Sequence, residues 1–304
     1  MTTATQTQTI GKGAPRITAG ERAGIPPRRM DFEFPAETTR YWYGDNAFLT
    51  TFWVTLSALF PEGETFFVDS VKNYRDRITD KHLKDQVSGF IGQEALHSKE
   101  HEEFNRMAEK HGLPAETLDK ELGVLFRLFR KYMPKKMQLA LTVALEHYTA
   151  IIAEQLLRED FHQEMFRDEE SLKLWMWHAL EENEHKTVAF DMYNLIGGGY
   201  LTRVGTMAFG TVVFGLVVIT GHLRLLHADG SLFKWKENWK GLKFLWGWKG
   251  LFPRLGRQYF DFYRPGFHPN DHDTEALLES WRQKMLNDGG LLANQTYSIA
   301  RAAK

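Results

Sequence analysis

The residues of this chain best suited to chemistry are two Glu-x-x-His pairs, Glu94/His97 and Glu182/His185. On a helix, this spacing places a carboxylate and an imidazole on one face, and both groups are metal ligands. Two such pairs, each joined by a glutamate from a neighbouring helix, are the ligand pattern of a two-metal carboxylate site inside a four-helix bundle. The pairs therefore predict a buried di-metal site.

Each Glu-x-x-His pair needs a glutamate from a neighbouring helix, and the points where the chain folds back predict which glutamates these are. The candidates are Glu64 and Glu146. Glu62 is the alternative to Glu64, and Glu154 is the alternative to Glu146. Glu64 and Glu94 are centred on residue 79, where polar residues break the apolar pattern, and Glu146 and Glu182 are centred on a second polar stretch near residue 164. Two helical hairpins would bring all four carboxylates to similar depth.

Helical geometry adds further histidines, because residues three or four apart share a face. His178 precedes Glu182 by one turn and is predicted to be a ligand, while His101 follows His97 by one turn and is a possible additional ligand. Polar residues directly before each Glu-x-x-His pair are predicted to orient the liganding imidazoles from behind. These residues are Gln93 and Glu181.

A mixture of carboxylates and imidazoles suits iron or manganese better than magnesium or structural zinc. We expect two iron ions, with manganese as the alternative. A reduced iron pair can activate O2, so the main prediction is an oxidoreductase that hydroxylates or oxygenates its substrate and is supplied by a separate electron donor. The alternatives are a two-metal hydrolase of an ester or amide and a non-catalytic iron-handling protein.

The residues near the candidate ligands are apolar, which predicts a hydrophobic small molecule or lipid as substrate. They are Phe90, Ile91, Leu145, Trp175, Met176 and Trp177.

The elements that must position these ligands read as helices. Apolar residues recur at helical spacing, and alternating strand patterns are almost absent. We predict helices over 45–60, ended by Pro61, and over 64–79, 81–110, 135–159 and 170–195. The fold is thus expected to be all-α, with a four-helix bundle over residues 31–200 and additional N- and C-terminal helices.

Composition excludes several classes of function. The formal net charge of −1 over 304 residues gives no electrostatic footprint for nucleic acid. The absence of cysteine excludes disulfides, iron–sulfur clusters, thiolate zinc sites and cysteine nucleophiles. Residues 1–30 lack the apolar core of a signal peptide, and we predict a disordered leader on a cytoplasmic protein.

The segment 201–262 differs in composition from the residues before it. Residues 204–223 contain no Lys, Arg, Asp or Glu, and the stretch after them mixes tryptophans with lysines. We predict a hydrophobic helix followed by a Trp/Lys-rich amphipathic helix, packed on the bundle or in peripheral contact with the inner face of the membrane. Residues 263–304 are predicted to be a loop and a helix, and the long helices allow a homodimer.

Four short motifs carry a resemblance to a known family. They are Phe-Pro-Glu-Gly-Glu at 60–64, Gly-Gln-Glu-Ala-Leu-His at 92–97, Glu-Asn-Glu-His at 182–185 and Arg-Pro-Gly-Phe-His-Pro at 264–269. Over roughly residues 30–280 the chain resembles bacterial proteins described as predicted metal-dependent hydrolases. This resemblance implies a ferritin-like helical core with a di-metal site.

The histidine that precedes the second Glu-x-x-His pair is also similar to the site of the diiron arylamine N-oxygenases. That likeness covers only the bundle. It implies metal-ligand roles for Glu64, Glu94, His97, Glu146, His178, Glu182 and His185.

Overall fold

The computed structural model describes residues 17–35, 37–293 and 295. Within this part of the chain there are helices and no strand, apart from an isolated bridge between Tyr43 and Phe166. The all-α prediction is therefore confirmed. The α-helices are α1 (Ala19–Ala23), α2 (Ala47–Lys72), α3 (Lys81–Lys110), α4 (Ala115–Tyr132), α5 (Lys135–Arg158), α6 (Asp160–Met165), α7 (Glu169–His185), α8 (Val188–Leu195), α9 (Tyr200–Asp229), α10 (Trp235–Trp246), α11 (Leu251–Asp261) and α12 (Glu275–Leu286), with short 3-10 helices at Arg75–Arg77 and Pro269–Asp271.

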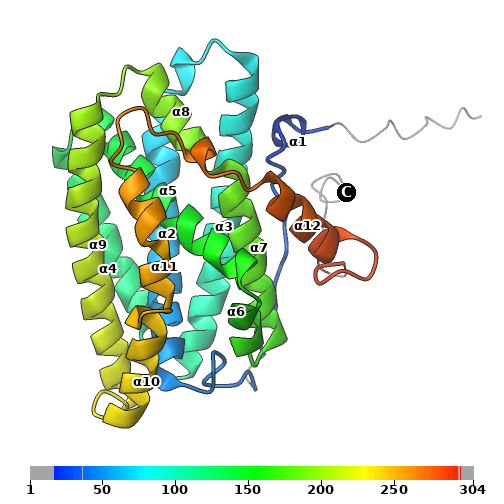
Figure 1. The fold of residues 1–304 in the computed structure, drawn as a ribbon, viewed down its shortest axis with the longest axis vertical. Coiled ribbons are helices and arrows are strands. Elements are labelled where there is room, and N and C mark those ends of the chain that lie inside the picture. Colours follow the sequence, from blue (N-terminus) through cyan, green and yellow to red (C-terminus); the bar gives the residue numbers. More distant parts are fainter. Residues whose placement is uncertain (1–16, 36, 294, 296–304) are drawn as a thin grey trace, which may run out of the picture.

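Four long helices, α2, α3, α5 and α7, pack on one another at the centre of the molecule: α2 contacts α3 and α5, and α7 contacts α5 and α3. Helix α4 packs against α2, and α9 packs against α5 and α2. Figure 1 shows α9 along one side of the molecule and α12 on the other. The predicted 201–262 unit consists of α9 and two short helices, since α10 packs on α2 and α11 on α5.

Helix starts follow from side-chain caps that satisfy free backbone N–H groups. Asp80 accepts a hydrogen bond from the Leu83 N–H at the start of α3, and Asp168 accepts one from Ser171 at the start of α7. The predicted helix over 81–110 is confirmed, because its cap and its apolar face agree.

The prediction that Pro61 ends the first helix is wrong, because α2 runs through it without a break. A proline inside a helix costs about 3 kcal/mol, since it removes one backbone hydrogen bond and crowds the preceding turn. Most residues of α2 are buried on both sides of Pro61, and this packing outweighs the local cost. As a result, Glu64 lies in the middle of a buried helix and not at a helix start.

The predicted helix over 170–195 is also wrong, because the chain forms two helices there. Helix α7 ends at His185 and α8 begins at Val188. Between them, the Lys186 ammonium donates to the His272 carbonyl and to the Thr274 hydroxyl, both far along the sequence. This contact with the C-terminal segment occurs where the chain breaks between α7 and α8. No residue near the break predicts it.

Residues 17–30 also differ from the predicted disordered leader over 1–30. Thr18 and Glu21 form a capping box on α1, and Ile25 and Met30 are buried. Residues 1–16 lie outside the described part of the chain. A few buried side chains therefore tie this polar segment to α3 and the core.

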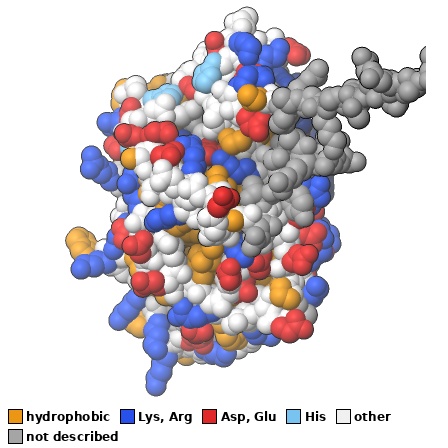
Figure 2. All heavy atoms as spheres, turned by 90° about the vertical axis from the view of Figure 1, so that its right-hand side faces the viewer, with side chains coloured by type: hydrophobic (Ala, Val, Ile, Leu, Met, Phe, Trp, Pro, Cys, Tyr) orange, Lys and Arg blue, Asp and Glu red, His pale blue; other side chains and the backbone are white. Residues whose placement is uncertain are grey.

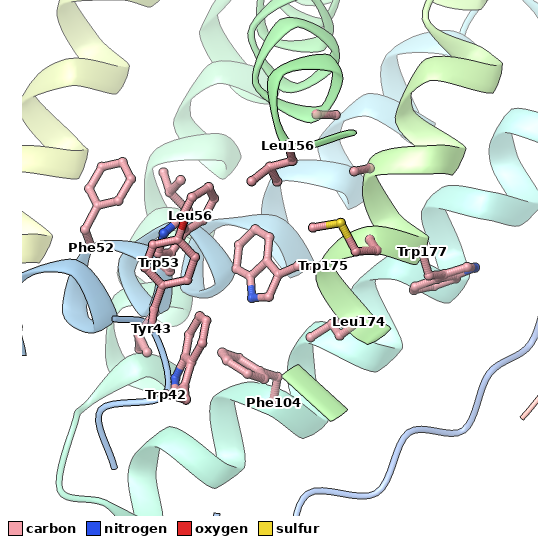
Figure 3. Packing of buried hydrophobic residues seen from close by; sticks show 14 of the residues in the cluster. Trp42, Tyr43, Phe52, Trp53, Leu56, Phe104, Leu156, Leu174, Trp175 and Trp177 are labelled. Atoms are coloured by element: carbon pink, nitrogen blue, oxygen red, sulfur yellow. The ribbon is translucent and has the colours of Figure 1, made fainter. Parts of the chain in front are cut away.

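An aromatic cluster packs at one end of the central helices (Figure 3). The Trp53 and Trp175 rings meet edge to face with centroids 4.8 Å apart, and Trp42 contacts Phe104 in the same way at 5.4 Å. A second apolar cluster, which includes Phe66 and other side chains from α2 to α5, forms a separate part of the core.

Candidate metal centre

The seven predicted ligands come together in the interior. They lie on α2 (Glu64), α3 (Glu94 and His97), α5 (Glu146) and α7 (His178, Glu182 and His185). Each has a relative exposure of 3% or less. Phe60, Phe90 and Trp177 enclose the imidazoles, with ring centroids 4.5–5.0 Å from His178, His185 and His97. Burying so many ionisable groups costs free energy unless an opposite charge or hydrogen bonds stabilise them.

Two compact groups of ligand atoms can be distinguished. One consists of Glu64, His97, His178 and Glu182, and the other of Glu94, Glu182 and His185; within each group the ligand atoms lie within 4.8 Å of one another. Glu182 belongs to both. Glu146 lies beside the second group, with its Oε2 3.4 Å from His185 Nε2. The substitutes Glu62 and Glu154 belong to neither group.

The polar residues before each pair support the histidine of the other pair. Gln93, on α3, has its Oε1 3.0 Å from Nδ1 of His185, and Glu181, on α7, has its Oε2 3.1 Å from Nε2 of His97. In each case one ring nitrogen bonds to the supporting side chain. The other nitrogen then faces the carboxylates, 3.0 Å from Glu94 Oε1 in His185 and 4.0 Å from it in His97.

A hydrogen-bond chain orients the third histidine. The Ser57 hydroxyl donates to Asn105 Oδ1, so its oxygen accepts from His101 Nδ1 at 2.8 Å. His101 Nε2 then accepts from His178 Nδ1 at 2.6 Å, which leaves His178 Nε2 directed at Glu182 Oε1, 2.8 Å away. His101 thus lies behind His178 and outside both ligand groups. The structure gives it an orienting position in place of the possible ligand position.

Many of these buried atoms have no hydrogen-bond partner. They are Glu64 Oε1, both carboxylate oxygens of Glu94 and of Glu146, Glu182 Oε2, His97 Nδ1 and His185 Nε2. Leaving a buried polar atom unsatisfied costs roughly 1–3 kcal/mol. A cation among these acceptor atoms would satisfy them together, so the residues present fit a metal ion.

The electrostatics of the site also favour positive charge. Burial and the neighbouring Glu182 raise the pKa of Glu94 well above its usual range, and burial and Glu94 do the same for Glu146. Although burial lowers it, the nearby carboxylates of Glu182 and Glu146 raise the pKa of His185 to about 9. A bound metal ion would replace these protons, because ligands bind metals in their deprotonated form.

An ion-pair network that the sequence did not predict closes the back of the site. Arg28 Nη1 lies 2.8 Å from Glu181 Oε1 and 2.8 Å from Glu184 Oε2, and all three side chains are buried. Gln93 Nε2 donates to Glu184 as well. Arg28 lies in the segment that we predicted to be a disordered leader, and nothing in its surroundings in the sequence marks it.

Replacing Arg28 with methionine should lower the free energy of unfolding by about 3–5 kcal/mol, because Glu181 would remain buried without a cation and Glu184 would keep only Arg282. Urea denaturation measures this loss. The Arg29→Met variant is the matched control, since Arg29 is half-exposed and pairs with the partly exposed Asp31. Equal stability of the two variants would contradict the role of the network.

A narrow cavity of about 100 Å³ leads to the first ligand group from the side of α4 and α9. Its walls are apolar side chains of α2, α4, α5, α7 and α9. The polar side chains that line it are Glu64, Tyr148, Thr149, His178 and Glu182. Three of these five belong to the metal-ligand set. The cavity therefore connects an apolar space with the candidate metal centre.

The comparison with known proteins is consistent with this site. A model of the predicted metal-dependent hydrolase family matches residues 26–273, which is more than half of the chain. The chain belongs to this family. No curated protein and no solved structure matches it.

For this member of the predicted metal-dependent hydrolase family, the buried Glu/His cluster is a site able to bind metal. The family description supports an enzyme, and it supports the hydrolytic alternative better than the oxidoreductase that we predicted first.

Proposed function

We propose that the protein is a two-metal hydrolase that cleaves an ester or amide with a long apolar portion. The observation that carries this proposal is the apolar cavity that ends at the carboxylate–imidazole cluster. Membership of the predicted metal-dependent hydrolase family supports the reaction class.

In this proposal each of the two ligand groups would hold one ion. Glu64, His97 and His178 would hold the first ion and Glu94, Glu146 and His185 the second, and Glu182 belongs to both groups of ligand atoms. Two divalent ions polarise a carbonyl oxygen and activate water for attack at neutral pH. The chain keeps the ligands fixed through Gln93, Glu181 and His101, and its apolar walls bind the substrate and exclude bulk water.

An oxidative reaction is the second candidate, and the composition of the site favours it. Three imidazoles with four carboxylates are a ligand set suited to iron or manganese. The cavity also offers few hydrogen-bond donors beyond the cluster that could recognise an ester or amide. In that case the same residues would hold two irons, which would supply O2 activation with electrons from a separate protein, and the apolar walls would bind the substrate to be hydroxylated or oxygenated.

One experiment separates the two candidates. Protein loaded anaerobically with zinc, manganese or ferrous iron is mixed with nitrophenyl esters of increasing acyl length, and product is measured with and without O2. Hydrolysis that proceeds without O2 and is supported by zinc or manganese is the expected result. Oxygen consumption by the ferrous protein without any ester cleavage would refute hydrolysis and favour the oxidative reaction.

Filling the cavity should weaken substrate binding without removing metal. The Val213→Trp variant places a larger side chain in the wall formed by α9, and we expect KM for long acyl chains to rise at least roughly tenfold while metal content is unchanged. The control is Val212→Trp on the exposed side of the same helix. An equal rise in KM for both variants would argue against the cavity as the substrate site.

We also propose that α2, α3, α5 and α7 form a ferritin-like four-helix bundle. The support is that each consecutive pair of long helices contributes one lone glutamate and one Glu-x-x-His pair, and that all four helices meet around the ligands.

A further inference from the structure

The outward face of α9 carries a long row of exposed apolar side chains. They are Leu201, Phe209, Val212, Leu216, Ile219 and Leu223. The helix has 30 residues, which corresponds to about 45 Å, and it is long and apolar enough to cross a membrane. Only 22% of its most apolar window is buried in the protein. An exposed apolar surface of this extent marks an interaction site.

The next helix extends this surface with tryptophans. Trp235, Trp239 and Trp246 of α10 are exposed, and Trp248 just after it has a relative exposure of 94%. Tryptophan is usually largely buried in soluble proteins. It is enriched where a protein meets the headgroup region of a bilayer.

Lysines lie among these tryptophans. They are Lys234, Lys236, Lys240, Lys243 and Lys249, and within the described residues none of them forms a salt bridge with a carboxylate. Residues 232–260 contain seven Lys and Arg and one Glu, whereas the whole chain has a formal net charge of −1. This end of α9 thus carries a local excess of positive charge.

We propose that this face, formed by the exposed side of α9 together with α10, docks on an anionic lipid bilayer. Tryptophan rings and apolar side chains would enter the boundary of headgroups and acyl chains, and the lysines would contact anionic headgroups. The α12 side of the molecule differs, since acidic and basic side chains alternate over it (Figure 2).

A second copy of the chain fits this face less well. A two-fold contact pairs the patch with itself, and residues 232–260 contain a single glutamate, so a second copy would offer few carboxylates to the lysines of α10. Anionic lipid instead supplies the complementary charge.

The geometry favours docking over a membrane crossing. The inner face of α9 packs on the central helices along its length, with Thr211 hydrogen-bonded to Tyr148 of α5 and Gly221 close against Thr55 of α2. A crossing by α9 would carry parts of these helices into the hydrocarbon layer. Docking exposes only the outer row to lipid.

The docking surface also borders the cavity. Phe209 of α9 lines the cavity wall and has a relative exposure of 41%. A docked protein would hold this edge of the cavity against the bilayer. The docking proposal itself stands independently of the reaction catalysed, since none of its contacts involves the metal ligands.

Vesicle flotation of the full chain tests the proposal. Vesicles of phosphatidylcholine alone are compared with vesicles in which roughly one third of the lipid is phosphatidylglycerol. We expect the protein to float with the anionic vesicles and to remain at the bottom with the neutral ones. The Lys236→Glu/Lys240→Glu/Lys243→Glu variant should lose at least roughly tenfold in bound fraction, and higher salt should weaken binding of the unaltered protein.

Two further variants complete the test. Trp235→Ala/Trp239→Ala/Trp248→Ala should also reduce flotation while the circular dichroism spectrum stays the same, because these side chains are exposed. Lys84→Glu/Lys110→Glu/Lys284→Glu makes the same charge change on α3 and α12 and should float like the unaltered protein. Three results would overturn the proposal: no flotation with either vesicle, equal loss in the α3/α12 control, or a stable dimer that the tryptophan variant dissociates.

Discussion

Replacing Glu182 with alanine should remove most of the bound metal and lower activity by at least roughly a hundredfold. Glu182 is the one residue shared by the two groups of ligand atoms, and it lies 2.8 Å from His178 and 3.6 Å from His185. Although burial raises it, the adjacent imidazoles of His178 and His185 hold the pKa of Glu182 well below its usual range, so its carboxylate is charged. In the proposed two-ion arrangement, its loss would weaken both positions together.

Metal quantification by mass spectrometry and an activity assay measure this effect. The matched control is Glu154→Ala, because Glu154 is a largely buried glutamate of α5 that pairs with Arg158 and lies outside both ligand groups. We expect the control to keep its metal. A Glu182→Ala protein that still binds two ions per chain would show that this carboxylate is not a shared ligand.

Removing the metal should destabilise the protein by several kcal/mol. A ligand present at a thousand times its dissociation constant contributes about 4 kcal/mol of stability, which for a chain of this size corresponds to a melting temperature roughly 10 °C lower after chelation. The physical cause is the crowding of Glu64, Glu94 and Glu146 in a buried space, where each carboxylate raises the energy of the others. Calorimetry before and after chelator treatment measures the difference.

The stability of the metal-free protein should fall as the pH rises above neutrality. In the metal-free protein the pKa of Glu94 is raised well above its usual range by burial and neighbouring charge, and that of His185 is raised to about 9. The folded state therefore holds the His185 proton up to about pH 9, whereas most of the unfolded chain has released it by pH 7. Stability of the metal-free protein should fall between pH 7 and 9, by about 1.4 kcal/mol per pH unit for each such proton. The metal-loaded protein should not show this loss.

The Glu94→Gln variant tests whether carboxylate charge destabilises the metal-free protein. Glu94→Gln keeps the shape of the side chain and removes its charge, so in the metal-free state it should be at least as stable as the unaltered protein at pH 8. With metal it should be less stable, because a ligand is missing. If the variant were less stable in both states, packing and not charge would explain the effect.

The positions of the candidate ligands could be predicted because they follow from helical periodicity and chain reversal. Glu-x-x-His spacing fixes one face of α3 and of α7, and the midpoints near residues 79 and 164 fall between the helices that carry each glutamate. Helix α3 was predictable in its bounds, since Asp80 supplies a cap and an apolar face follows. These are local properties, which a sequence displays directly.

Features that depend on distant contacts could not be predicted. Pro61 reads as a helix end, yet burial of α2 on both sides of it keeps the helix continuous. His101 has the spacing of a ligand, but Ser57 and His178 take both of its ring nitrogens. Arg28 pairs with Glu181 across more than 150 residues of sequence.

The sequence by itself therefore determined the all-α class, the ligand types and the helix faces that carry them, because helical periodicity and side-chain chemistry are local. Only the tertiary structure decided that Glu64 joins the first ligand group and that Glu146 lies beside the second, whereas Glu62 and Glu154 belong to neither. It also decided which face of α9 remains exposed and where the apolar cavity meets the carboxylates. These outcomes depend on how helices far apart in the chain pack, and packing energy can override local preference.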